Sequence, residues 1–161
     1  MTVIDHPARQ TFELNRRIKA EFGDHACWGA GLIFDSMLTL EFGGKHTLIG
    51  KRGPITIGDF RVLLDDVFWL AERDGKVVLT SEQPGAEDIN ALNAVFVGHR
   101  LLRMEWGVYC SLIFSDDLVL RCDLTDEYEN GCEQIFEFRF PNGDCVDCFV
   151  DGVIETERPR E

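Results

Sequence analysis

Short apolar runs with a period of two follow residue 24, and they limit the fold more than any other feature of the chain. Apolar and polar side chains alternate in residues 38–42 and 136–140, and residues 118–122 keep apolar side chains at every second position. This alternation is typical of a β-strand with one face buried and the other in contact with water. The sequence therefore predicts a mainly β protein built from antiparallel strands.

Tight-turn residues separate the runs. Gly, Asp and Asn accept the left-handed backbone conformations that two- and three-residue hairpin loops require. We expect hairpins with turns at Gly43-Gly44, Asp74-Gly75, residues 115–117 and residues 141–143. Residues 60–71 also fit a helical spacing, but their β-branched and aromatic content and the hairpin signal after them favour strands.

Two segments have helical spacing instead. Leu14, Ile18 and Phe22 recur every four residues, which predicts an N-terminal helix within residues 1–24. A second, short helix is predicted within the linker at residues 84–97, after the Pro84-Gly85 breaker. Acidic residues just after this breaker suit the first turn of a helix, because the helix dipole favours negative charge there.

An internal repeat underlies the β pattern. Trp28-Gly29 and the segment LIFDSMLTLEF (residues 32–42) return as Trp106-Gly107 and LIFSDDLVLRC (residues 112–122), with the LIF segments 80 residues apart. Each copy ends in a predicted hairpin. We expect an α+β, mainly β fold in which two repeated antiparallel β-meanders form one sheet system or sandwich, with an N-terminal helix and a short linker helix.

Chain length and composition indicate one domain over residues 1–161. Its expected parts are an N-terminal helix (1–24), a first β-meander (25–83), a linker helix (84–97) and a second, acidic β-meander (98–157). The opening residues lack the basic and apolar runs of a secretory signal, and no apolar run approaches the roughly 20 residues of a membrane span. We expect a cytoplasmic protein with free thiols and no membrane contact.

Negative charge is the main functional signal. The formal net charge is −13, and residues 105–157 contain 14 acids against only Arg121 and Arg139. Such a surface repels nucleic acid, whose recognition needs clustered Lys and Arg, and it attracts a cationic partner. The alternative is that the acids only keep the protein soluble.

Cys145 and Cys148 form a CxxC motif, the spacing found in zinc sites and in redox proteins. A three-residue loop at 141–143 would pair Phe138 with Val146 and Phe136 with Cys148. The two thiols then point to opposite faces of one strand, with Cys148 in the core. We expect no metal site and no redox site at this motif.

Hydrolase, nucleotide-binding and zinc-peptidase motifs are absent from the sequence, and the four histidines lie far apart. Carboxylate pairs such as Asp65-Asp66 are too numerous for any one of them to indicate catalysis. We therefore expect a protein that is not an enzyme, with no catalytic residue and no cofactor.

The densest acidic segment runs from residue 115 to residue 133. Repulsion among its carboxylates would be relieved by Lys and Arg of a partner, and tyrosine is enriched in protein interfaces. The predicted partner-binding residues are Asp116, Asp117, Asp123, Asp126, Glu127, Tyr128, Glu129, Glu133 and Asp147. The alternative for this segment is a solvated polar loop.

In size, acidity, β-rich build and lack of catalytic motifs, the chain resembles the bacterial immunity proteins that neutralise toxins. The resemblance is one of type and includes no diagnostic motif. It implies an inhibitor that binds a basic toxin enzyme, such as a nuclease, through the acidic C-terminal face. Two alternatives stay open: a nucleic-acid mimic that blocks a DNA-binding protein, and a small-ligand-binding protein or carboxylate-based enzyme in a β fold. The sequence does not indicate the oligomeric state.

Overall fold

The structure, a computed structural model, is mainly β, with 60% of the described residues in strands, and confirms the predicted fold class. It describes residues 7–33, 37–65, 67–83, 85–86, 88–107, 109–123, 134–149, 152 and 154–157. The helices are α1 (Pro7–Glu21) and α2 (Ile89–Phe96). The strands are β1 (Cys27–Ile33), β2 (Met37–Gly50), β3 (Gly53–Leu64), β4 (Trp69–Arg73), β5 (Lys76–Thr80), β6 (Leu101–Trp106), β7 (Tyr109–Phe114), β8 (Leu118–Asp123), β9 (Gln134–Arg139), β10 (Cys145–Phe149) and β11 (Ile154–Glu157).

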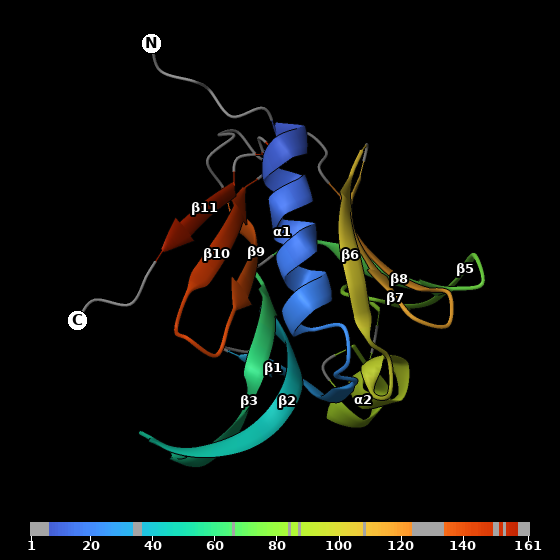
Figure 1. The fold of residues 1–161 in the computed structure, drawn as a ribbon. Helices are drawn as coiled ribbons and strands as arrows, with labels where there is room; N and C mark the ends of the chain where they lie inside the picture. The colour runs from blue at the N-terminus through green and yellow to red at the C-terminus, as the bar shows by residue number, and fades with distance from the viewer. Residues whose placement is uncertain are drawn as a thin grey trace.

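Two antiparallel sheets enclose the core. The first sheet has the strand order β1-β2-β3-β9-β10-β11, and the second has the order β5-β4-β8-β7-β6. Figure 1 shows α1 between the two sheets, where it contacts β6 of the second sheet and β11 of the first. The sandwich is therefore closed along this side by a helix.

Aromatic side chains join α1 to the first sheet. Phe22, at the end of α1, is fully buried, and its ring lies 5.3 Å from that of Phe42 and 5.0 Å from that of Phe60. It also packs edge-on against Phe138 and Phe140 of the C-terminal half. The predicted helical spacing is confirmed, because Leu14, Ile18 and Phe22 all face the core.

The two halves of the chain exchange their closing hairpins. The β4–β5 hairpin of the first half adds to β8 in the second sheet, and the β9–β10 hairpin of the second half adds to β3 in the first sheet. The repeated LIF segments lie in the β1–β2 and β7–β8 hairpins, one in each sheet. Each sheet thus contains strands from both halves.

Three of the four predicted turns are confirmed. Asp74 and Gly75 have φ values of 53° and 77°, and Asp116 and Asp117 have φ values of 61° and 60°. The third turn contains Gly143, with a φ of 91°, at the end of the three-residue loop between β9 and β10. These left-handed positions are the ones for which Gly, Asn and Asp are favoured.

The turn predicted at Gly43-Gly44 is wrong. The β2 strand continues through these glycines with a register shift between Phe42 and Lys45, and the chain turns at residues 51–52. Gly43 has a φ of 75°, and the N–H of Gly44 donates to Asp59 Oδ2. The glycine pair therefore makes a β-bulge, which bends the strand without ending it.

Beyond the bulge, residues 45–50 and 53–58 form a two-stranded ribbon that pairs with no third strand among the described residues. Figure 1 shows this ribbon curving away from the rest of the first sheet. Its apolar side chains are exposed, Ile49 most of all at 87%. The glycines predicted to end the strand therefore mark the start of a ribbon that projects from the first sheet.

Helix side chains satisfy backbone groups on the sheet edges. Asn15 of α1 donates from Nδ2 to the carbonyl of Met104 and accepts at Oδ1 from the Met104 N–H, both at 2.8 Å. Gln10 of α1 accepts from the N–H of Ile154 on β11. On the opposite edge of the first sheet, Asn93 of α2 accepts from Ala30 on β1 at 2.7 Å. An amide side chain has both a donor and an acceptor, so it can imitate a neighbouring strand.

Replacing Asn15 with Ala should lower the free energy of unfolding by about 2 kcal/mol, because the N–H and C=O of Met104 lose their partners. Urea denaturation measures this change. Asn90→Ala, at an exposed position on α2, is the control and should change the free energy of unfolding by less than about 0.5 kcal/mol. Equal effects of the two substitutions would show that the Asn15 amide contributes nothing specific.

Candidate partner-binding surface

The residues predicted to bind a partner divide into three groups. Asp116, Asp117 and Asp147 are described in full, and Asp123 is the last residue of β8. The remaining predictions lie outside the described residues: Asp126, Glu127, Tyr128, Glu129 and Glu133.

Asp116 and Asp117 form the exposed turn between β7 and β8. The neighbouring turn between β4 and β5 approaches it, with the N–H of Asp74 donating to the carbonyl of Asp117 at 3.3 Å. Three aspartates of two adjacent turns therefore gather at one end of the second sheet. One of them has a basic neighbour, because Asp116 Oδ2 lies 3.6 Å from His99 Nδ1.

Asp147 belongs to a second acidic group, on the outward face of the first sheet. It lies directly between Glu137 of β9 and Glu155 of β11, so that three carboxylates form a row across three strands. Glu157 is two residues from Glu155 and shares its face. We call these four residues the carboxylate row. Asp147 is only 7% exposed, and Gln134 donates to its Oδ1.

The pKa of Asp147 is raised from 3.8 to about 6. Burial is the largest cause, because it disfavours the charged form, and the carboxylates of Glu137, Glu157 and Glu155 add to it. Arg139 opposes the shift, but it does not reverse it. The carboxylate row therefore holds more negative charge than its own cations neutralise.

The two acidic groups belong to different sheets. In Figure 1 the β10–β11 region and the β7–β8 hairpin lie on opposite sides of α1. Within the described residues, the structure thus brings Asp116 and Asp117 together with Asp74, and it places Asp147 in a separate group.

Sequence reasoning missed Glu137, Glu155 and Glu157 as members of a surface. The signal was present in the hairpin register, which fixes the residue opposite Asp147 on β9. The pairing of β10 with β11 is not visible in the sequence pattern, because the short segment IETE alternates only weakly.

Asp144, in the loop between β9 and β10, belongs to neither acidic group. Its carboxylate is buried and lies 2.9 Å from Arg17 Nη1 on α1. Arg17 also stacks on the ring of Phe140, with its guanidinium carbon 3.7 Å from the ring centroid. Asp144 is therefore a structural partner of α1, and its charge is compensated.

The predicted register of the CxxC motif is confirmed. Phe138 pairs with Val146 and Phe136 pairs with Cys148, which is fully buried, whereas Cys145 lies on the outward face. Burial raises the pKa of both thiols, and the nearby Glu137 raises that of Cys145 further. Neither sulfur is activated as a thiolate, which argues against nucleophilic or redox chemistry at this motif.

Comparisons with known proteins give no relative: no family model, no curated protein and no solved structure matches the chain. Neither of the described helices is both long enough and apolar enough to cross a membrane. The function of the protein is therefore inferred from the chain's own residues.

The left-handed backbone conformation at position 117 is by itself a sufficient reason for Asp there, and glycine and alanine variants test this explanation. Asp117→Gly should be more stable than Asp117→Ala by about 1 kcal/mol, because glycine adopts a positive φ without the steric cost of a Cβ atom. Both variants lose the same charge, so the difference in urea denaturation isolates the backbone effect. A stability of Asp117→Ala equal to that of Asp117→Gly would contradict a left-handed turn.

The raised pKa of Asp147 predicts a pH-dependent stability. The folded state holds this proton more tightly than the unfolded state, so it loses stability as the pH rises from 3.8 through about 6. Asp147→Asn keeps an acceptor for Gln134 and removes this loss. The variant should be more stable than the parent by about 1 kcal/mol at pH 7, a value reduced for solvent screening, and by almost nothing at pH 4.

Thermal or urea unfolding at several pH values measures the effect. The exposed Asp24→Asn provides the control for loss of one negative charge. If the Asp147→Asn and Asp24→Asn proteins show the same pH profile, the carboxylate row does not perturb Asp147.

Proposed function

We propose that the chain is a binding protein that neutralises a basic partner, in the manner of the immunity proteins that it resembles in type. The partner is a toxin enzyme with a cationic surface, such as a nuclease, whose active site must attract phosphate. The protein itself performs no chemistry on the partner. Its surface supplies the carboxylates that pair with the partner's Lys and Arg side chains.

One observation carries this proposal, namely the carboxylate row. Cross-strand like charges are destabilising when they lie directly opposite one another, as Glu137, Asp147 and Glu155 do. A fold that keeps such a row gives up stability, and a cationic partner restores it. The raised pKa of Asp147 has burial as its largest cause, and repulsion from Glu137, Glu157 and Glu155 adds to it.

Binding would proceed in two stages. The net charge of −13 first accelerates the encounter with a basic partner, because opposite fields steer diffusing proteins together. A Lys or Arg then lies over the carboxylate row and favours the ionised form of Asp147. The acidic segment at residues 123–133 would extend the contact, and its Tyr128 supplies an interface-type side chain.

The nucleic-acid mimic fits the described residues less well. A mimic needs acids spaced along one continuous ridge, like the phosphates of a duplex. The described acids instead form two groups on different sheets. A compact carboxylate row suits a local cluster of cations on a protein better than it suits a DNA-binding groove.

Neutralising Glu155 and Glu157 tests the proposed face. The double variant Glu155→Gln/Glu157→Gln should bind the partner about fivefold more weakly and with a smaller salt dependence, because two exposed ion pairs are lost. Asp24→Asn/Glu82→Gln changes the net charge equally on exposed positions away from the row, and it should keep its affinity.

The partner is first obtained by pull-down from the source organism at low salt, with release at high salt, and the affinity is then measured by calorimetry. Reversal of Asp126, Glu127 and Glu129 to Lys tests the acidic segment in the same assay. Equal affinities for the two double variants would remove the carboxylate row from the interface. Failure to retain any basic protein at low salt would contradict the proposed function.

A further inference from the structure

A small pocket lies between the projecting ribbon and the β9–β10 loop. Its volume is about 250 Å³, and its lining includes His46 of the ribbon, Asp59 and Arg61 of β3, Arg139 of β9 and Cys145 of β10. The pocket is smaller than the roughly 300–1,000 Å³ of a typical drug-sized ligand site. It therefore has room for an ion or for the end group of a larger ligand.

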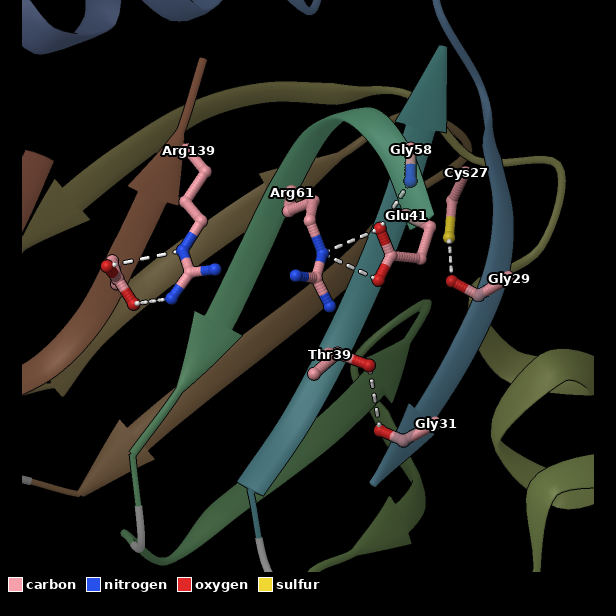
Figure 2. A network of polar contacts seen from close by, with 9 residues as sticks. Cys27, Gly29, Gly31, Thr39, Glu41, Gly58, Arg61 and Arg139 are labelled. Carbon is pink, nitrogen blue, oxygen red and sulfur yellow. Dashed lines mark hydrogen bonds and ion pairs between the residues drawn. The ribbon is translucent and has the colours of Figure 1, made fainter. Parts of the chain in front are cut away.

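Two arginines lie directly opposite one another at this pocket. Arg61 pairs with Arg139 across β3 and β9, and both side chains project from the outward face of the sheet. Figure 2 shows their guanidinium groups side by side on the two neighbouring strands. Like charges in directly opposite positions repel, so the arrangement requires compensating anions.

Each arginine is compensated by one carboxylate. Arg61 Nε donates to Glu41 Oε1 at 2.8 Å and to Oε2 at 2.9 Å, and Glu41 also accepts from the N–H of Gly58 at 2.9 Å. Arg139 contacts Glu137 through Nε and Nη2, both at 3.3 Å. These contacts leave both terminal nitrogens of Arg61 and Nη1 of Arg139 without a hydrogen-bond partner in the described part of the chain.

The unused donors are available to a ligand. The side chain of Arg61 is 11% exposed, and its terminal nitrogens still reach the surface, because among the described residues only the indole nitrogens of Trp28 and Trp106 are buried without a hydrogen-bond partner. Glu41 holds the guanidinium of Arg61 in a fixed orientation through contacts to Nε. Asp59 does not serve as the missing acceptor, because it pairs with His46 Nε2 and accepts from the N–H of Gly44.

We propose that this pocket binds a tetrahedral oxyanion of the phosphate or sulfate class, held between Arg61 and Arg139. Guanidinium donors match such oxygens in pairs, and the nitrogens left free on Arg61 and Arg139 lie at directly opposite positions on β3 and β9. His46, at the mouth on the ribbon, lies within the same lining. The site shares β9 and β10 with the carboxylate row, but oxyanion binding there does not require the proposed toxin partner.

Titration with sodium phosphate, followed by amide chemical shifts of the full chain at constant ionic strength, tests the site. The expected result is a saturable shift of the Gly58, Gly143 and Cys145 amides with one common dissociation constant. Sodium chloride at equal ionic strength should give no saturable shift. Methyl phosphate and sulfate are titrated in parallel: binding of methyl phosphate supports the end group of a larger ligand, and binding of inorganic ions alone supports a free oxyanion.

Arg139→Gln is the test variant, because this side chain is 44% exposed and its loss should not prevent folding. It should weaken phosphate binding about tenfold, the cost of a lost charge-assisted hydrogen bond. Arg103→Gln is the matched control: Arg103 is 50% exposed and pairs with Glu105 two residues away, as Arg139 does with Glu137. It should bind phosphate like the parent.

A second variant, Arg61→Lys, retains the charge beside Glu41 but loses the planar donors, and it too should weaken binding about tenfold. Absence of a saturable shift in the parent protein would overturn the proposal. Equal weakening in Arg139→Gln and Arg103→Gln would also overturn it, because the effect would then come from net charge and not from the pocket.

Discussion

The exchange of closing hairpins between the two sheets is the constraint on which the rest of the structure depends. Phe138 can pair with Val62, and Leu120 with Ala71, only because each half of the chain reaches into the sheet of the other. The exchange places β9 beside β3, and it thereby creates the pair of opposed arginines. Contacts between residues this far apart in sequence close large loops, which slows folding more than it affects stability.

Local features of this fold were predictable from the sequence, and contacts between distant segments were not. The turns at Asp74-Gly75 and residues 115–117 depend on the backbone preferences of a few residues, and so does the register that separates Cys145 from Cys148. The bulge at Gly43 carries the same local signal as a turn, and only the pairing of β2 with the full length of β3 distinguishes the two. In the same way, nothing near Asp144 in the sequence indicates that Arg17 compensates it from the N-terminal helix.

The pairing of individual charged side chains describes this protein better than its net charge does. Most described cations near the C-terminal half already have a partner, as Arg17 does in Asp144 and Arg121 does in Glu72. In the carboxylate row compensation is incomplete, whereas in the arginine pair each guanidinium has one carboxylate and keeps unused donors. They lie on neighbouring strands of the same outward face, since Arg139 and Glu137 are two residues apart on β9. A net charge of −13 therefore conceals a face on which both signs are exposed.

The amide side chains that lie along the strand edges also protect the protein against aggregation. An uncovered edge strand presents unpaired N–H and C=O groups that can recruit a strand from another molecule. One helix, α1, provides this cover for an edge of each sheet, through Asn15 on β6 and Gln10 on β11. Detachment of α1 alone would expose the edge strands β6 and β11 at the same time and would expose Phe22 to solvent. The docked helix therefore prevents strand-to-strand association between copies of the chain.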